Sequence, residues 1–234
     1  MLRKILRDLK RLALKRPCPE VINVVRSKAL TYLNEEALYD LYYRIKELEE
    51  SDKVGILIEA GCALGGSAIV IATAKTPSRK LYVYDVFGMI PPPSAKDGVD
   101  VHERYQEIES GRSKGLGDGK YYGYEENLLD KVFDSFRDHG IPIESNNINL
   151  VKGLFQDTII INDPVLLAHI DGDWYDSVMV CLTRIAPHLV RGGILVIDDY
   201  EAWSGCRRAV DEYFEDKRSE YEFIFNSRLH IIRK

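Results

Sequence analysis

Apolar residues recur with two different periods along the chain. Short runs rich in Val, Ile, Leu and Tyr alternate with longer stretches in which apolar residues return every three or four positions. The short runs are candidate strands: Val54–Glu59, Lys80–Asp85, Asn149–Lys152, Leu166–Asp171 and Ile194–Asp198. The candidate helices lie between or after them: Ser67–Lys75, Tyr124–His139, Ser177–Val190 and Gly205–Lys217. This alternation predicts an α/β fold, with a parallel sheet that is covered by helices on both faces.

The end of the chain follows a different pattern. The apolar runs Tyr221–Asn226 and Leu229–Arg233 are separated only by Ser227 and Arg228. So short a link cannot contain a crossover helix, and the two runs must therefore form an antiparallel hairpin. The sequence predicts seven strands, of which five are parallel and the last two form this hairpin.

The first 50 residues form a predicted helical extension of the domain at 51–234. Residues 1–16 are rich in Lys and Arg and carry apolar residues at helical spacing, and Asn34–Glu50 forms a second amphipathic pattern with Asn34 as its N-cap. The basic helix can dock on its own domain, on a second copy in a homodimer, or on an anionic membrane surface as a peripheral contact. These three alternatives stay open. No apolar run here is long enough to cross a membrane.

Residues 86–123 form the longest irregular stretch. They contain Pro91-Pro92-Pro93 and a glycine-rich segment. A connection that leaves the carboxyl end of a central strand lies over the ligand crevice of an α/β sheet. We therefore predict a substrate lid at about 86–123, with a solvated insertion as the alternative.

Composition narrows the class of protein. The chain has 234 residues and a net charge of -5, which is not the basic excess of a nucleic-acid binder. Its four cysteines form no CxxC pair, so they indicate reduced thiols and a cytoplasmic protein. We expect one sizeable domain and no nucleic-acid partner.

A glycine-rich turn follows the first predicted strand. The segment IEAGCALGGS places Glu59 at the strand end, then Gly61, Gly65, Gly66 and Ser67 at the start of a helix. The spacing is not the GxGxxG of a pyrophosphate-binding turn. It is similar to the E/D-x-G-x-x-x-G loop of S-adenosylmethionine methyltransferases, in which the loop lies along the cofactor. The alternative is an ordinary tight turn between a strand and a helix.

Asp85 supports the cofactor interpretation. It ends the second predicted strand, where a carboxylate can accept hydrogen bonds from the two hydroxyls of a ribose. A solvated acid at a strand end is the alternative. Together these patterns predict a site for S-adenosylmethionine.

Acidic residues gather after the next two strands. Asp171 ends one predicted strand and Asp173 follows it closely, and Asp198 and Asp199 end the next strand. Neighbouring parallel strands carry Asp171, Asp198 and Asp199 to the same edge, where like charges repel unless a cation lies among them. Oxygen ligands suit a hard cation such as magnesium, with manganese or calcium as alternatives. The alternative is a set of ordinary strand-end and capping acids.

Longer segments resemble one family. They are IEAGCALGGSA, YVYDVFGMIPPP, LVKGLFQDT, HIDGDWYDS and GGILVIDDYEAWSGCRRAVDEYF. The chain resembles the macrocin O-methyltransferase (TylF-type) family, which methylates sugar hydroxyls with the help of a divalent metal. The resemblance implies the Rossmann-like, seven-stranded class I methyltransferase fold, with a small-molecule or glycan acceptor. It also implies Asp171, Asp198 and Asp199 as metal ligands, and a mobile lid.

The resemblance also frames the catalytic roles. A sugar hydroxyl is hardly ionised at neutral pH, so a carboxylate must take its proton. The candidates are Asp173 and Asp171, and Asp173 is preferred because metal binding would weaken the basicity of Asp171. His169 is interpreted as a packed residue.

Three other functions fit parts of the pattern. A metal-dependent methyltransferase for catechol-like diols uses the same chemistry as a sugar methyltransferase. A nicotinamide-dependent oxidoreductase fits the alternating fold, but the absent GxGxxG and the terminal hairpin argue against it. A non-catalytic relative that only binds S-adenosylmethionine would have no need to keep the acidic cluster.

Overall fold

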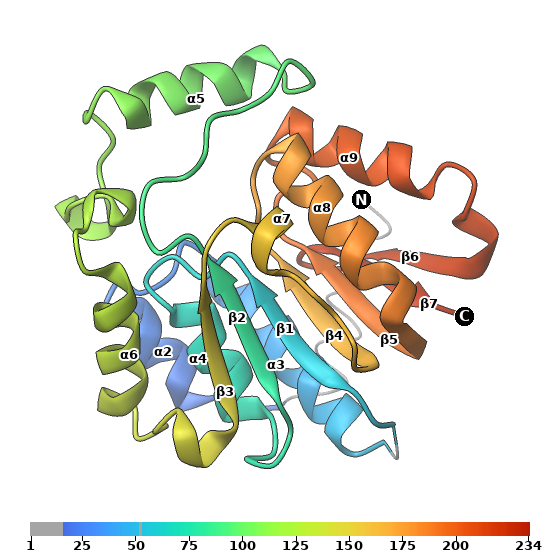
Figure 1. Ribbon diagram of the computed structural model, residues 1–234. Helices are drawn as coiled ribbons and strands as arrows, with labels where there is room; N and C mark the ends of the chain where they lie inside the picture. Colours follow the sequence, from blue (N-terminus) through green and yellow to red (C-terminus); the bar gives the residue numbers. More distant parts are fainter. Residues whose placement is uncertain (1–15, 52) are drawn as a thin grey trace.

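The computed structural model describes residues 16–51 and 53–234. A single seven-stranded sheet forms its centre, with the strand order β3-β2-β1-β4-β5-β7-β6 (Figure 1). The strands are β1 (Ile56–Ala60), β2 (Leu81–Asp85), β3 (Ile148–Lys152), β4 (Val165–Ile170), β5 (Leu189–Ile197), β6 (Tyr221–Phe225) and β7 (Leu229–Arg233). Strands β1 to β5 are parallel, and β7 is antiparallel to both β5 and β6. The predicted parallel sheet with a terminal hairpin is therefore confirmed.

Strand β5 is longer than predicted. It begins at Leu189 rather than Ile194, because Leu189 pairs with Val165 of β4 before a register shift. The glycine pair at 192–193 breaks the apolar pattern inside this strand, which concealed its first half in the sequence.

Helices cover both faces of the sheet, as predicted. One face carries α2 (Glu20–Ser27), α3 (Glu35–Glu49), α4 (Gly66–Ala74) and α6 (Leu128–Asp138). The other face carries α7 (Phe155–Thr158), α8 (Tyr175–Ile185) and α9 (Ser204–Phe214). Successive strand residues point to opposite faces, so Leu57 joins the first core and Ile58 the second. Burial on both faces explains why these strands are apolar without alternation.

The helices α2 and α3 share the main core. Asn34 caps α3 by accepting a hydrogen bond from the Ala37 amide, as its position in the sequence predicted. Leu38 and Ile45 of α3 are fully buried in the same cluster as α4 and the sheet. These two helices therefore extend the domain's own core. The proposed basic helix at 1–16 lies outside the described residues except for Arg16.

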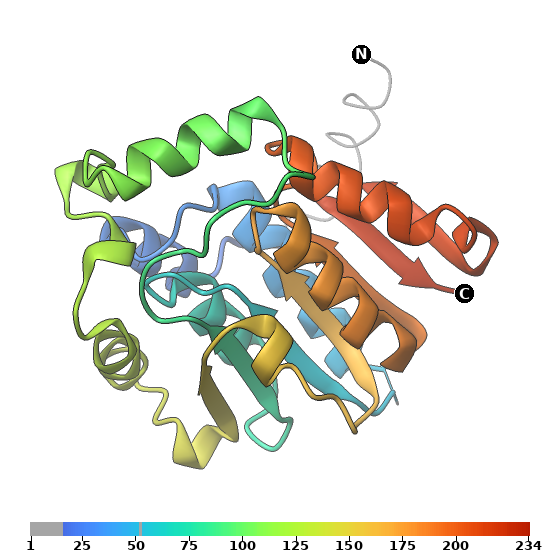
Figure 2. The same cartoon turned by 45° about the horizontal axis from the view of Figure 1, so that its top comes forward.

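The region 86–123 contains a regular helix that the sequence analysis did not predict. Helix α5 (Val99–Glu109) crosses above the carboxyl ends of the strands, apart from the two helical layers (Figures 1 and 2). Val101 and Ile108 are its buried residues, and they pack with Trp174 and Tyr121 in a small separate cluster. Proline and glycine on either side of α5 obscured this short amphipathic pattern.

Among the described residues, no helix combines the length and the apolar character that a membrane crossing requires.

We predict that Ile45→Ala lowers the free energy of unfolding of the whole domain by about 3 kcal/mol, because it opens a cavity in a shared core. Urea unfolding should show one transition, displaced to lower concentration. Val54→Ala is the control, since Val54 is 74% exposed and its truncation should change stability by less than about 0.5 kcal/mol. A separate early transition in Ile45→Ala would show that α3 folds independently of the sheet.

Candidate active site

The turn after β1 lies against the turn after β4. Gly61 has φ of 90°, and a Cβ at this position would overlap the carbonyl oxygen of Asp171. The Gly61 amide donates to the Tyr84 carbonyl at 2.8 Å, and the Asp171 amide donates to the Ala60 carbonyl at 2.8 Å. Only glycine allows both the positive φ and this close approach. The glycine turn is thereby placed directly beside the first acid of the cluster.

Asp85 holds the glycine turn in place. Its Oδ2 accepts the amides of Cys62 at 2.8 Å and Ala63 at 3.2 Å, and its Oδ1 accepts the amide of Phe87 at 2.6 Å. Burial raises the pKa of this carboxyl, although the three amides oppose the effect. Asp85 therefore ties the turn after β1 to the turn after β2.

Glu59 is buried behind the turn. Its side chain is fully inaccessible, with one carboxylate oxygen accepting the Ser67 hydroxyl and the other 2.8 Å from Nδ1 of His169. Burial alone would lower the pKa of His169, but the charges of Glu59 and Asp198 outweigh it and raise the pKa to about 10. His169 is therefore a buried cation at neutral pH, held between two strand-end acids.

Gly65 and Gly66 shape the other side of the turn. Gly65 has φ of 89°, and the Gly66 amide donates to the Leu30 carbonyl at 2.9 Å. A Cβ at Gly66 would approach that carbonyl oxygen to 2.5 Å. The two glycines therefore seat the connection between α2 and α3 on the first turn of α4.

Asp198 continues the charged chain from His169 to the hairpin. Its Oδ1 lies 3.6 Å from His169 Nε2 and accepts Nε of Arg228 at 2.6 Å. Burial favours a higher pKa for Asp198, but His169 and Arg228 lower it. Asp198 is thus ionised, with Oδ1 engaged by cations of the protein.

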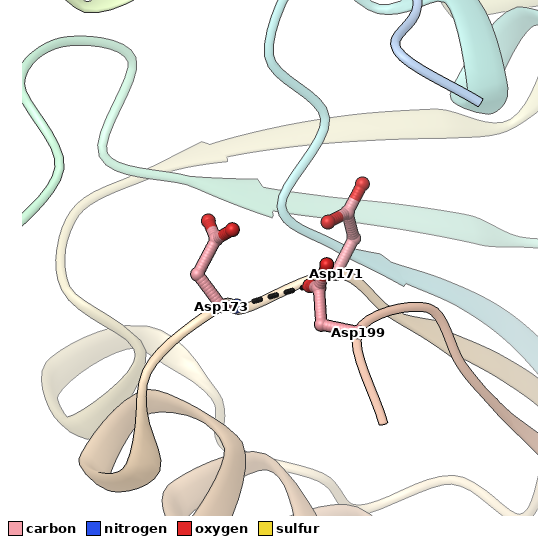
Figure 3. Close-up of side chains that lie close together, drawn as sticks. All are labelled: Asp171, Asp173 and Asp199. Atoms are coloured by element: carbon pink, nitrogen blue, oxygen red, sulfur yellow. Dashed lines mark hydrogen bonds between the residues drawn. The ribbon is translucent and has the colours of Figure 1, made fainter. Parts of the chain in front are cut away.

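Three other acids face one another. Asp171, Asp173 and Asp199 each offer a carboxylate oxygen within 4.8 Å of the others (Figure 3). The Asp173 amide donates to Asp199 Oδ2 at 3.3 Å, which is the dashed contact in Figure 3. These acids come from the turns after β4 and β5, which are neighbours in the sheet. The sequence predicted Asp171, Asp198 and Asp199 as the metal-binding group; in the structure the closest group of carboxylate oxygens contains Asp173 in place of Asp198.

Crowding makes the cluster reluctant to ionise fully. Burial, followed by the charge of Asp198, raises the pKa of Asp171 well above its usual range. Burial and the charge of Asp173 do the same to the pKa of Asp199. Burial and Asp198 raise the pKa of Asp173 to about 6, against a hydrogen bond from Trp203. The surroundings therefore do not supply enough positive charge to keep all of these acids ionised together.

A cavity of about 530 Å³ opens above these residues. That volume is within the range of small-molecule sites. Its acidic lining consists of Asp85, Asp171, Asp173, Asp198, Asp199 and Glu201, and its aromatic lining includes Tyr32, Tyr121, Tyr122, Trp174, Tyr200 and Trp203. Arg104 of α5 and Arg228 are the cations of this lining. The lining of the cavity therefore combines aromatic side chains with a strongly acidic group of residues.

Part of the region 86–123 is attached to the rim of this cavity. Trp174 Nε1 donates to the Pro91 carbonyl at 2.9 Å. The Tyr175 amide at the start of α8 donates to Asp97 Oδ1 at 2.8 Å. The segment before α5 is thus anchored to the turn that carries the acids.

The predicted site residues fall into two groups. Gly61, Asp85, Asp171, Asp173, Asp198 and Asp199 line the cavity. Glu59, Gly65, Gly66 and Ser67 lie behind it, where they hold the turn and the start of α4. Arg228 also lines the cavity and was not among the predicted residues, although the short hairpin link that contains it was predicted. The pairing of Leu229 with Ile197 brings this link beside the end of β5.

Comparison with known proteins identifies the family of this chain. A family model described as macrocin-O-methyltransferase (TylF) matches residues 25–224. Over 193 residues the chain is 28% identical to the 8-demethyl-8-(2,3-dimethoxy-alpha-L-rhamnosyl)-tetracenomycin-C 4'-O-methyltransferase of Streptomyces olivaceus, covering 80% of this chain and 68% of that protein. Over 198 residues it is 25% identical to the demethyldecarbamoylnovobiocin O-methyltransferase of Streptomyces niveus, with the same coverage.

A solved structure shares the fold. The O-methyltransferase NovP superposes with a TM-score of 0.71 at 23% identity, over 88% of this chain and 81% of that one. The resemblance inferred from the sequence motifs is confirmed, because the matching model spans most of the chain. The chain belongs to the macrocin O-methyltransferase (TylF) family and is an S-adenosylmethionine-dependent O-methyltransferase.

Proposed function

We propose that this protein transfers a methyl group to a hydroxyl of a sugar or glycosylated acceptor, with the assistance of a divalent metal, magnesium above all. The observation that carries the proposal is the group of four acids that line the 530 Å³ cavity, the part-buried Asp171, Asp173 and Asp198 and the buried Asp199. They lie beside the glycine turn, where a cofactor would meet an acceptor.

The cavity suits a sugar acceptor. Aromatic rings can stack on the apolar face of a sugar ring, and carboxylates can accept hydrogen bonds from its hydroxyls. Tyr121 and Trp174 provide such rings near the acids. The rhamnosyl group in the name of the Streptomyces olivaceus relative supports the same class of acceptor.

The acids fit a hard cation. All donors are oxygen atoms, and three of them lie within 4.8 Å of one another. The raised pKa values of Asp171 and Asp199 show that the protein alone leaves the cluster under-compensated. A divalent cation, when bound, supplies positive charge that stabilises developing negative charge on the acceptor oxygen.

We assign Asp171, Asp198 and Asp199 as the residues that hold the cation. Asp198 is kept ionised by His169 and Arg228, and both contact Oδ1, so Oδ2 is available. The alternative is Asp173 in place of Asp198, since Asp173 belongs to the closer group of oxygen atoms. The two assignments predict different effects of Asp173→Asn and Asp198→Asn on metal binding.

Asp173 is the proposed general base. Its pKa of about 6 makes it a stronger base than an ordinary aspartate while leaving it ionised at neutral pH. It lines the cavity next to Asp171, so its carboxylate can take the proton from an acceptor hydroxyl. Asp171 is the weaker candidate for this role, because a bound cation would lower its basicity.

S-adenosylmethionine supplies the methyl group as an electrophilic sulfonium when it is bound. Gly61, Ala63 and Asp85 line the cavity and are proposed to contact it directly. Glu59 and Ser67 hold the strand end and the start of α4 from behind. The chain contributes chiefly by positioning the cofactor and the acceptor for in-line transfer.

Asp85→Asn should weaken the binding of S-adenosylhomocysteine by about tenfold or more, because an amide cannot accept all three backbone N–H groups of the two turns. Calorimetric titration without metal measures this affinity. Asp134→Asn on the exposed side of α6 is the matched control and should bind like the wild type. Unchanged affinity in a folded Asp85→Asn protein would contradict the proposed cofactor site.

Methylation of 4-nitrophenyl α-L-rhamnopyranoside should stop in EDTA and return with magnesium, because the acids need a cation to compensate them. Asp198→Asn should raise the magnesium concentration for half-maximal rate by roughly tenfold or more. Asp173→Asn should lower kcat roughly 100-fold or more without changing metal affinity, as expected for loss of a base.

Manganese binding, followed by electron paramagnetic resonance, separates the two assignments of the ligands. If Asp173→Asn lost manganese binding while Asp198→Asn kept it, Asp173 would be the metal ligand in place of Asp198. Metal-independent turnover would refute metal assistance. Turnover of 4-nitrocatechol in preference to the glycoside would indicate an aromatic diol acceptor.

A further inference from the structure

The indole of Trp203 contacts the proposed base directly. Its Nε1 donates to Asp173 Oδ1 at 3.0 Å. The ring packs edge-on against Trp174, with 5.7 Å between the ring centroids. The bond occupies one oxygen of the carboxylate and leaves Oδ2 for another partner. The orientation of the Asp173 carboxylate is therefore set by a neutral N–H donor on the wall of the cavity.

The backbone of Asp173 needs such support. Asp173 has φ of 53°, a conformation that non-glycine residues rarely adopt. Its amide donates to Asp199 Oδ2, and the Trp203 amide donates to the Asp199 carbonyl at 3.0 Å. Asp173, Asp199 and Trp203 thus form one small network, in which Trp203 is attached to the turn that also carries an acid of the cluster.

The same network is attached to α5. Ser204 follows Trp203 and begins α9. Its amide and its hydroxyl both donate to the Asp100 carboxylate of α5, at 2.9 Å and 2.5 Å. Gly98 lies so close to Ser204 that a Cβ there would overlap the hydroxyl. Trp203 is therefore connected through Ser204 to α5, the helix that crosses above the carboxyl ends of the strands (Figures 1 and 2).

We propose that Trp203 is a positioning residue that aims the Asp173 carboxylate at the acceptor hydroxyl and couples this aim to the seating of α5 through Asp100 and Ser204. This inference rests on the proposed role of Asp173 as the base. It assigns Trp203 a function that its aromatic character alone does not indicate: the N–H group, rather than the ring, is what the reaction requires. Binding of the acceptor beneath α5 and the orientation of the Asp173 carboxylate are then linked.

Trp203→Phe separates the N–H group from the ring, because phenylalanine can still pack against Trp174. We expect kcat with 4-nitrophenyl α-L-rhamnopyranoside to fall about tenfold or more. The acceptor KM and the affinity for S-adenosylhomocysteine should stay within about twofold. A purely structural role would instead raise KM or weaken cofactor binding along with kcat. An unchanged kcat would overturn the proposal.

The chain contains only two tryptophans, so its ¹⁵N–¹H spectrum holds two indole signals. Trp203→Phe identifies the signal of Trp203 in the full-length protein. Asp173→Asn should move this signal, because it replaces the charged acceptor, and Asp100→Asn should move it by loosening the contact with Ser204. Asp134→Asn should move neither signal.

An indole signal of Trp203 that does not respond to Asp173→Asn would overturn the hydrogen bond, and no response to Asp100→Asn would overturn the coupling to α5. These spectra need no turnover. If no glycoside is methylated while the Trp203 signal responds to both variants, the proposed acceptor fails and the positioning network stands.

Discussion

A buried chain of charges at the carboxyl edge of the sheet organises the rest of the site. It runs from Glu59 of β1 through His169 of β4 to Asp198 after β5, and ends at Arg228 in the hairpin link. Each member comes from a different strand or turn, and each charge is balanced by an opposite neighbour. Losing one partner from such a buried set leaves an uncompensated charge, which costs about 3–5 kcal/mol. These paired charges therefore fix how the strand ends, and with them the functional turns, lie relative to one another.

That arrangement explains why the cluster of acids can exist. Asp198 is compensated by His169 and Arg228, whereas Asp171 and Asp199 are not compensated by any comparable contact in the described part of the chain. The positive φ of Asp173 and the repulsion among the acids are both kept in place by the surrounding structure. Such unfavourable local features are typical of functional sites. The hairpin has a role beyond closing the sheet, since β7 pairs with β5 and thereby delivers Arg228 to the acids. The terminal hairpin that characterises the methyltransferase fold therefore also supplies a positive charge to the site.

Much of this architecture could be predicted from the sequence. Buried strands and the two-residue link specify the seven-stranded sheet, and strand-end acids specify where the site lies. The roles of individual acids could not be predicted, because they depend on which way each side chain turns. Glu59 was expected at the cofactor, yet its side chain turns toward Ser67 and His169. The motif places Glu59 at the strand end in either case, so the sequence does not show which way its side chain turns. His169 was interpreted as a packed residue, and only the two carboxylates around it show that it is charged. Helix α5 was hidden between proline and glycine runs.

The central claim is that a divalent cation lies among these acids during methyl transfer. A crystal structure of the protein grown with S-adenosylhomocysteine and manganese tests it most directly, because anomalous scattering locates manganese without assumption. We expect one strong peak held by Asp171, Asp198 and Asp199, beside the glycine turn, with Asp173 Oδ1 bonded to Trp203. A cofactor bound in the cavity with no anomalous peak among the acids would contradict it.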